Sequence, residues 1–150
     1  LSTSNNQYQI QGVNVLELCE KFDSPLYIYD ASKMQEKVNL LQESFKDVNV
    51  KIKYACKALN NLSVLKLFKY YGTGLDTVSI QEVHLGLMAG FAPKEIIFTP
   101  NCVSFEEIKE AVRLGVVINI DNISILEQFG HEYGNSVPCC IRLNPHIMAG

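Results

Sequence analysis

The sequence has 150 residues, of which 47% are hydrophobic and 19% charged, and its formal net charge is −3 at pH 7. This composition is typical of a soluble globular domain with a sizeable core. The 13 lysine and arginine residues form no basic run, which argues against a nucleic-acid partner. No apolar stretch is long enough to span a membrane and the N-terminus lacks a signal-peptide pattern, so we expect a cytoplasmic protein with no membrane partner.

The cysteines and histidines form no pattern typical of a metal site. There is no C-x-x-C pair, and the three histidines do not have zinc-ligand spacing relative to the five cysteines. We therefore expect reduced, mostly buried thiols and no metal. The residues concerned are Cys19, Cys56, Cys102, Cys139, Cys140, His84, His131 and His146.

Near the N-terminus, the run SPLYIYD at 24–30 is strand-like and is entered through Pro25. Ser32 and Gln35 then have the spacing of a capping pair and predict a helix over 33–45, with its apolar residues on one face. This strand–helix pair differs in spacing from the elements that follow. Its strand could therefore open the same sheet or pair elsewhere.

From residue 50 onward the chain alternates regularly between strand and helix. Five short runs rich in apolar or β-branched residues predict strands, and corresponding points lie roughly 21–22 residues apart. Each gap holds one helical pattern of apolar residues. The predicted strands are 50–56, 74–78, 95–99, 116–120 and 137–143.

Capping patterns bound these predicted helices. In an S-x-x-E pair the serine oxygen accepts an amide at the helix start, and the glutamate reaches back to the cap. Glycine suits the left-handed residue that often ends a helix. The pairs are Ser79–Glu82, Ser104–Glu107 and Ser124–Glu127, and the glycines are Gly72, Gly90, Gly115 and Gly130.

The alternation predicts a parallel α/β sheet, either an open doubly wound sheet or part of a (β/α)8 barrel. No G-x-G-x-x-G and no P-loop motif follows any predicted strand, which removes the usual nucleotide signatures of the open sheet. The near-equal repeats suit a barrel better. The predicted strands are too few to close one, so the pattern favours a barrel fragment.

In parallel α/β folds, chemistry is carried at the C-terminal ends of the strands. Alternation in the first strand places Lys57 on the face opposite Tyr54 and Cys56. If the apolar face meets the helices, Lys57 points into the barrel mouth, where a desolvated lysine can form a Schiff base. The polar residues at the other strand ends are Asp76, Thr99, Asn101, Cys102, Asp121, Asn122, Arg142 and Asn144.

Each of these residues also has an ordinary structural explanation. A lysine at a strand end is most often exposed to solvent, and Glu82 is accounted for by its cap to Ser79. Arg142 could pair with a surface carboxylate. Only their convergence on one rim of the sheet points to chemistry.

Several motifs, in order, resemble those of the fold-type III pyridoxal-phosphate enzymes, which share an alanine racemase-like barrel. YACKALNN at 54–61 resembles their Y-A-x-K-A-N stretch, and GLDTVSIQEVHLGLMAGF at 74–91 resembles their G-x-D-x-x-S-x-x-E segment. Further similarity lies in SPLYIYD, in 96–116 and in CIRLNPHIMAG at 140–150. The chain departs from the family at Ile80-Gln81, where glycines are usual, and at Pro100-Asn101, where Gly-Asn is common.

The resemblance implies pyridoxal 5'-phosphate as cofactor, held as an imine on Lys57. It implies that Asp76 lies beside the cofactor near that lysine, and that Arg142 approaches the phenolic oxygen of the ring. Candidates for supporting roles are Tyr54, Glu82 and Asn101.

The resemblance also implies a domain organisation. Residues 1–31 would contribute a strand to a second, all-β domain that is mostly absent from this chain, and 32–150 would form the first part of the cofactor-binding barrel. The family's phosphate-binding loop would lie beyond Gly150, so we expect this chain to be inactive alone. Members of the family are homodimers.

Similarity is greatest to the diaminopimelate decarboxylases, carbon–carbon lyases that convert meso-diaminopimelate to L-lysine in the last step of lysine biosynthesis. The expected partner is therefore a small amino-acid substrate. Decarboxylation of ornithine, arginine or carboxynorspermidine on the same fold is the nearest alternative. A non-catalytic pyridoxal-phosphate carrier built on a lone barrel is an alternative of another class, against which the SPLYIYD segment argues.

Overall fold

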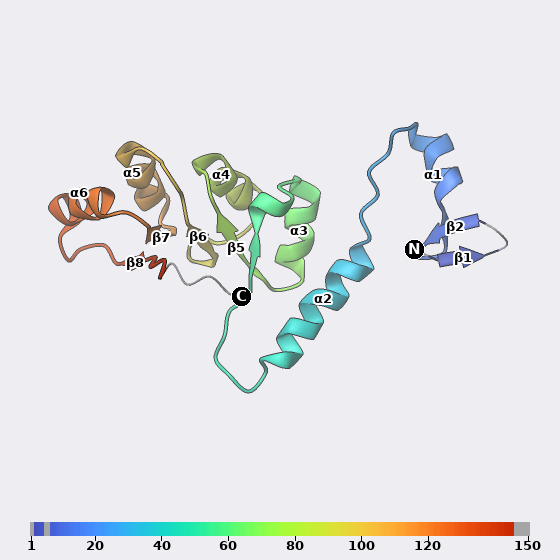
Figure 1. Ribbon diagram of the computed structural model, residues 1–150, viewed down its shortest axis with the longest axis horizontal. Helices are drawn as coiled ribbons and strands as arrows, with labels where there is room; N and C mark the ends of the chain where they lie inside the picture. The colour runs from blue at the N-terminus through green and yellow to red at the C-terminus, as the bar shows by residue number, and fades with distance from the viewer. Residues whose placement is uncertain (1, 5–6, 146–150) are drawn as a thin grey trace. The chain divides into compact units, whose positions relative to one another are not determined.

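The computed structural model describes residues 2–4 and 7–145, so His146 and the end of the CIRLNPHIMAG motif lie outside the described residues (Figure 1). The chain divides into two compact units, Leu1–Val48 and Asn49–Gly150. The first unit contains a three-stranded antiparallel sheet in the order β1-β2-β3 and two helices. Its elements are β1 (Ser2–Ser4), β2 (Gln7–Ile10), β3 (Val13–Asn14), α1 (Val15–Phe22) and α2 (Ala31–Ser44).

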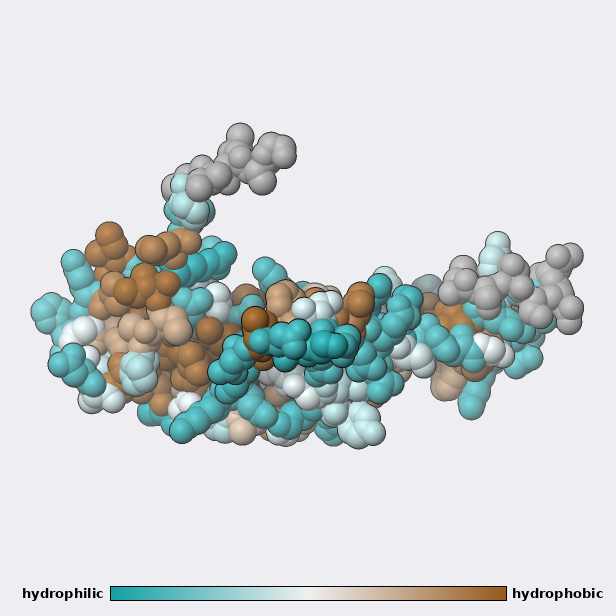
Figure 2. Space-filling model, turned by 90° about the horizontal axis from the view of Figure 1, so that it is seen from below, coloured by the Kyte–Doolittle hydropathy of each residue, from teal (hydrophilic) through white to brown (hydrophobic). Residues whose placement is uncertain are grey.

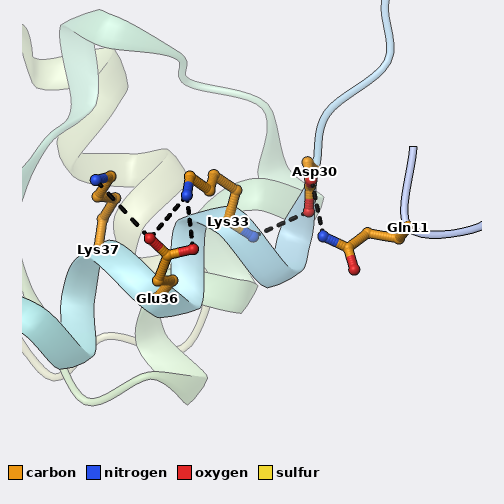
Figure 3. Close-up of polar contacts among 5 residues, drawn as sticks. All are labelled: Gln11, Asp30, Lys33, Glu36 and Lys37. Carbon is orange, nitrogen blue, oxygen red and sulfur yellow. Dashed lines mark hydrogen bonds and ion pairs between the residues drawn. The ribbon is translucent and has the colours of Figure 1, made fainter. Parts of the chain in front are cut away.

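Asp30, rather than the predicted Ser32, caps the start of α2. Its carboxylate accepts the Lys33 amide at 2.9 Å and the Gln11 side-chain amide at 3.1 Å (Figure 3). These hydrogen bonds, the one from Gln11 first, lower the pKa of Asp30. The prediction was wrong because an aspartate two residues earlier competes for the same orphan amides, and it leaves Ser32 inside the helix.

The SPLYIYD segment forms no ladder with any strand in the described part of the chain. It runs extended, with Leu26 and Ile28 half-buried and the intervening Tyr27 and Tyr29 exposed. This is the alternation of a strand with one covered face. A strand is defined by its hydrogen-bonded neighbour, and the described residues supply none here.

The second unit is a five-stranded parallel sheet whose order, β4-β5-β6-β7-β8, follows the chain. A helix or short helical turn follows each of the first four strands, and α4, α5 and α6 line up along one side of the sheet (Figure 1). Sequential parallel order with helices on one side is barrel topology, because an open doubly wound sheet reverses its order. The elements are β4 (Lys53–Ala55), η1 (Cys56–Ala58), α3 (Leu62–Tyr70), β5 (Gly74–Thr77), α4 (Ile80–Met88), η2 (Pro93–Glu95), β6 (Ile96–Phe98), α5 (Phe105–Leu114), β7 (Val117–Ile120), α6 (Ile123–Tyr133) and β8 (Cys139–Ile141).

The core lies between this sheet and its helices. Alternate strand residues such as Leu75, Phe98 and Ile118 are at most 1% exposed and pack with residues of the helices. Gly86 allows α4 to approach closely, since a Cβ there would lie 2.6 Å from a Leu75 methyl. The other face of the sheet, here called the inner face, therefore carries the intervening residues of each strand.

The caps of the second unit agree with the sequence in two cases out of three. Ser79 and Ser104 cap α4 and α5, and Gly115 ends α5 in the left-handed conformation. Helix α6 differs, because Asn122 caps it and Ser124 lies inside. The predicted C-terminal Gly130 is also inside α6, which ends before Gly134. An asparagine two residues nearer the strand reaches the orphan amides first, so the serine continues the helix.

All five cysteines are free thiols, but only Cys56 is buried, so the prediction of mostly buried thiols was wrong. Within the described ranges, no helix is both long and apolar enough to cross a bilayer. His131, predicted in a loop, lies in the last turn of α6.

Candidate active site

Strand register brings the site residues onto one face of the sheet. Ala55, Asp76, Ile97 and Val117 are paired in a row from β4 to β7. Their chain neighbours Leu75 and the other alternate residues face the helices, so this row lies on the inner face. Asp76 is thus half-buried on the inner face of β5, next to the strand that leads to Lys57.

Lys57 lies on a turn rather than at the end of a strand. Strand β4 ends at Ala55, and Lys57 is the middle residue of the 3₁₀ turn η1. Cys56 is 0% exposed and anchors this turn in the core, whereas Lys57 is exposed. Among the described residues, Lys57 makes no hydrogen bond or ion pair. Its ammonium is therefore available for chemistry at the C-terminal edge of the sheet.

Tyr54 faces the helices and supports the turn from behind. Its ring stacks on Phe68 of α3 at a centroid distance of 3.7 Å, and its hydroxyl donates to the Leu59 carbonyl at 3.0 Å. The two contacts close the chain around η1 on the side opposite Asp76. Tyr54 is placed to hold the backbone of the turn on which Lys57 is carried.

Glu82 fixes the backbone directly after β5. The side chain is 7% exposed, and its carboxylate accepts the Val78 amide at 2.8 Å. Ser79 in turn accepts the Glu82 amide at 3.2 Å. Burial, with the nearby carboxylates of Glu82 and Asp76, raises the pKa of Cys56 to about 12. The thiol beside Lys57 therefore stays protonated and uncharged.

Two further predicted residues lie on neighbouring parts of the same edge. Asn101 is exposed in the loop between β6 and α5, and its side-chain oxygen lies 3.4 Å from the Cys102 thiol. Arg142 follows β8, and its amide donates to the Ile120 carbonyl at 2.8 Å, which extends the ladder by one residue. Alternation from Cys140 puts Arg142 on the inner face.

Two inner-face residues were not singled out from the sequence. Lys53 crosses this face beside Gly74 and donates to the Glu95 carbonyl at 2.8 Å, and desolvation lowers its pKa. Asn119, in the middle of β7, has a buried Oδ1 without a hydrogen-bond partner. A polar residue inside the apolar run VVINI was a visible signal for Asn119. Nothing in the described part of the chain groups acidic, histidine or cysteine side chains closely enough to hold a metal ion.

Comparison with known proteins shows which protein family has this fold and this arrangement of residues at the C-terminal edge of the sheet. Residues 31–150 match a family model described as the pyridoxal binding domain of pyridoxal-dependent decarboxylases. The chain therefore belongs to the pyridoxal-dependent decarboxylase family.

Within this family, the chain is similar to proteins named diaminopimelate decarboxylase. A diaminopimelate decarboxylase of Methanothermobacter thermautotrophicus is 34% identical over 143 residues, which are 94% of this chain and 33% of the relative. The Bacillus subtilis enzyme of the same name is 33% identical over 147 residues, 94% of this chain and 34% of its own. The chain thus spans about a third of the length of these curated relatives.

Solved structures have the same fold as this chain. The M. jannaschii diaminopimelate decarboxylase, in complex with L-lysine, has a TM-score of 0.88 and 28% identity, and the match covers 98% of this chain and 36% of that one. A lysine/ornithine decarboxylase of Vibrio vulnificus, in complex with putrescine, has a TM-score of 0.77 and 25% identity over 86% of this chain and 35% of its own. The sheet described above therefore has the fold of the corresponding part of both decarboxylases, in agreement with the predicted barrel fragment.

The edge of the sheet suits a pyridoxal group. An exposed lysine without a partner in the described residues can bind its aldehyde, and Arg142 can bind an anionic oxygen. Asp76 supplies a carboxylate on the same face, and the buried, unpaired Asn119 oxygen still needs a donor there. These residue types match the chemistry of the family's cofactor.

Proposed function

We propose that this chain forms the N-terminal part of a decarboxylase that releases CO2 from meso-diaminopimelate and yields L-lysine. The observation that carries the proposal is Lys57, an exposed lysine on a core-anchored turn at the C-terminal edge of a parallel sheet. The names of the relatives support the substrate, and three of the similar structures are complexes with L-lysine, which is the product of this reaction.

Each residue at the C-terminal edge of the sheet has a defined role in this reaction. Pyridoxal phosphate, when bound, supplies an electron sink for the pair that departing CO2 leaves behind. Lys57 provides the attachment point, because its Nζ becomes a nucleophile once it has lost a proton. Arg142 offers a planar set of donors for an anionic oxygen, and Asp76 offers a carboxylate near Lys57. Tyr54 and Glu82 hold the backbone on which these groups are carried.

The family also supports proposals about the assembly. We infer a homodimer in the cytoplasm, with residues 1–31 contributing to a β-domain and 32–150 to the barrel. Sedimentation of the full-length protein with and without residues 1–31 tests the first point, because loss of that segment should weaken a dimer that depends on the β-domain.

Covalent labelling tests the role of Lys57 directly. Full-length protein carrying this sequence is incubated with pyridoxal phosphate, reduced with borohydride and mapped by peptide mass spectrometry. The cofactor should be found on Lys57 and not on Lys53, which lies four residues earlier on the inner face and serves as an internal control. Lys57→Ala should abolish the label and reduce CO2 release by roughly a thousandfold. Label on any other residue contradicts the assignment.

A second substrate class has support from one of the similar structures. The V. vulnificus protein is named a lysine/ornithine decarboxylase and is complexed with putrescine. Release of CO2 from meso-diaminopimelate, ornithine, arginine and carboxynorspermidine by the full-length protein separates the possibilities. We expect the highest kcat/KM with meso-diaminopimelate.

A further inference from the structure

Asn119 has an unmet requirement for a hydrogen-bond donor. Its Oδ1 is the single buried side-chain oxygen or nitrogen without a partner in the part of the chain that is described. Its neighbours Ile118 and Ile120 are at most 2% exposed and face the helices, so Asn119 faces the inner side. Buried amide oxygens are costly when unpaired and are nearly always satisfied in native proteins. A donor on the inner face is therefore expected.

The register shows which side chains lie near this oxygen. Asn119 is paired with Cys140 on β8, and Val117 precedes it on the same face of β7. Thr99, one residue beyond the Phe98–Ile118 pair, lies beside Asn119 on the β6 side. Arg142 lies two residues beyond Cys140, and its amide continues the β7–β8 ladder by donating to the Ile120 carbonyl at 2.8 Å. Asn119 and Arg142 are thus on adjacent strands, on the same face and one step apart along the strand direction.

Arg142 has the complementary requirement. A guanidinium carries five N–H donors and no acceptor. The Arg142 side chain is exposed, and it makes no hydrogen bond or ion pair with the described residues. Valine has no donor, the thiol of Cys140 is a weak one and the hydroxyl of Thr99 is neutral, so Arg142 offers the strongest donor among these neighbours.

We propose that Asn119 is a positioning residue that accepts a hydrogen bond from Arg142 and directs its guanidinium along the inner face toward Lys57 and Asp76. A neutral amide suits this task, because it orients the guanidinium without cancelling the charge that must bind an anionic oxygen. An aspartate at position 119 would hold Arg142 equally well and neutralise it. The identity of the anion that Arg142 binds rests on the proposed function. The contact between Asn119 and Arg142 does not depend on it.

A double-mutant cycle on the full-length protein tests the contact without the cofactor. Urea unfolding is measured for the unsubstituted apoprotein, Asn119→Leu, Arg142→Met and the double variant, with Val117→Ala as a packing control on the same face. We expect Asn119→Leu to change stability in the unsubstituted protein and to have little further effect once Arg142 is replaced. Val117→Ala should have the same effect in both backgrounds. Additive effects of Asn119→Leu and Arg142→Met overturn the contact, and Asn119→Ala enters the same cycle if the leucine variant does not fold.

Cofactor affinity tests the direction that Asn119 gives to Arg142. Asn119→Leu and Arg142→Met should each weaken binding of pyridoxal phosphate about tenfold, and the double variant should bind no more weakly than Arg142→Met. If the double variant loses affinity for pyridoxal phosphate by the product of the two single losses, the positioning role is overturned, even where the unfolding cycle shows that the two residues are coupled. If the unsubstituted protein takes up no cofactor on Lys57, that result contradicts the proposed function only. The contact between Asn119 and Arg142 is still decided by the unfolding cycle.

Discussion

Glu82 and Glu107 occupy the same position in two S-x-x-E motifs, yet the structure gives them different energetic importance. Glu82 is 7% exposed and accepts the Val78 amide at 2.8 Å. Glu107 is half-buried and accepts the Ser104 amide at 3.1 Å, where that serine is exposed to water. Glu82 accepts from the residue before the cap Ser79, and Glu107 accepts from the cap itself. Alanine substitution at the two positions therefore compares a buried and an exposed backbone hydrogen bond made by the same sequence motif.

The expected decrease in unfolding free energy depends on what replaces each hydrogen bond in the alanine variant. At position 82, alanine leaves the Val78 amide without a charged acceptor in a site that the side chain had shielded, which costs about 2–3 kcal/mol. At position 107, water can replace the carboxylate, and we expect a loss of about 0.5–1 kcal/mol. The difference between Glu82→Ala and Glu107→Ala should be about 1–2.5 kcal/mol.

Urea unfolding followed by far-UV circular dichroism measures this difference. The midpoint should fall further for Glu82→Ala, with an unchanged m-value. Glu82→Gln is the matched control, because it keeps an acceptor oxygen at nearly the same volume and should recover more than half of the loss. Equal losses at the two positions, or a larger loss at Glu107, would refute the claim that burial decides the strength of this motif.

Four further outcomes are expected. Burial raises the pKa of Cys56 to about 12, so iodoacetamide should label exposed Cys102 in the native protein well before Cys56; equal rates by mass spectrometry contradict this. Because the folded pKa lies above the ordinary 9.0, Cys56 should also lose stabilising effect as the pH rises from 9.0 toward 12, and Cys56→Ala should remove that dependence. Gly74→Ala would place a Cβ 2.7 Å from the carbonyl oxygen of Glu95, the last residue of η2, and should lower the unfolding free energy by about 1–3 kcal/mol; an unchanged urea midpoint contradicts this. Asp30→Ala should expose the first-turn amides of α2 to hydrogen exchange, whereas Asp30→Asn should protect them.

Much of the second unit could be predicted because its signals are local and repeated. The five predicted strands all contain observed ones, and their sequential parallel order follows from the helix between each pair. The helix starts were less certain, because several polar residues compete for the same amides. Asp30 and Asn122 took the caps predicted for Ser32 and Ser124, and spacing alone does not rank such neighbours.

The candidate site was predictable in composition and less so in geometry. Lys57 and Asp76 were predicted as site residues from their positions near strand ends, and the structure pairs β4, which leads to Lys57, with β5, which carries Asp76. Period-two alternation could not show that β4 stops at Ala55 and that a 3₁₀ turn follows. Asn119 was missed because its significance depends on an unpaired, buried oxygen, and burial is known only once the sheet is assembled.

The 3₁₀ turn that carries Lys57 has a consequence for protein engineering. Its backbone is held by the buried Cys56 and by the hydrogen bond from Tyr54 to Leu59, while the lysine itself is exposed. A reactive lysine moved to the end of another strand would lack this support, and the local backbone alone would set the direction of its side chain. The portable unit is therefore the whole hexapeptide Tyr54–Leu59 together with an aromatic partner such as Phe68, and a grafted lysine without them should react slowly and unselectively.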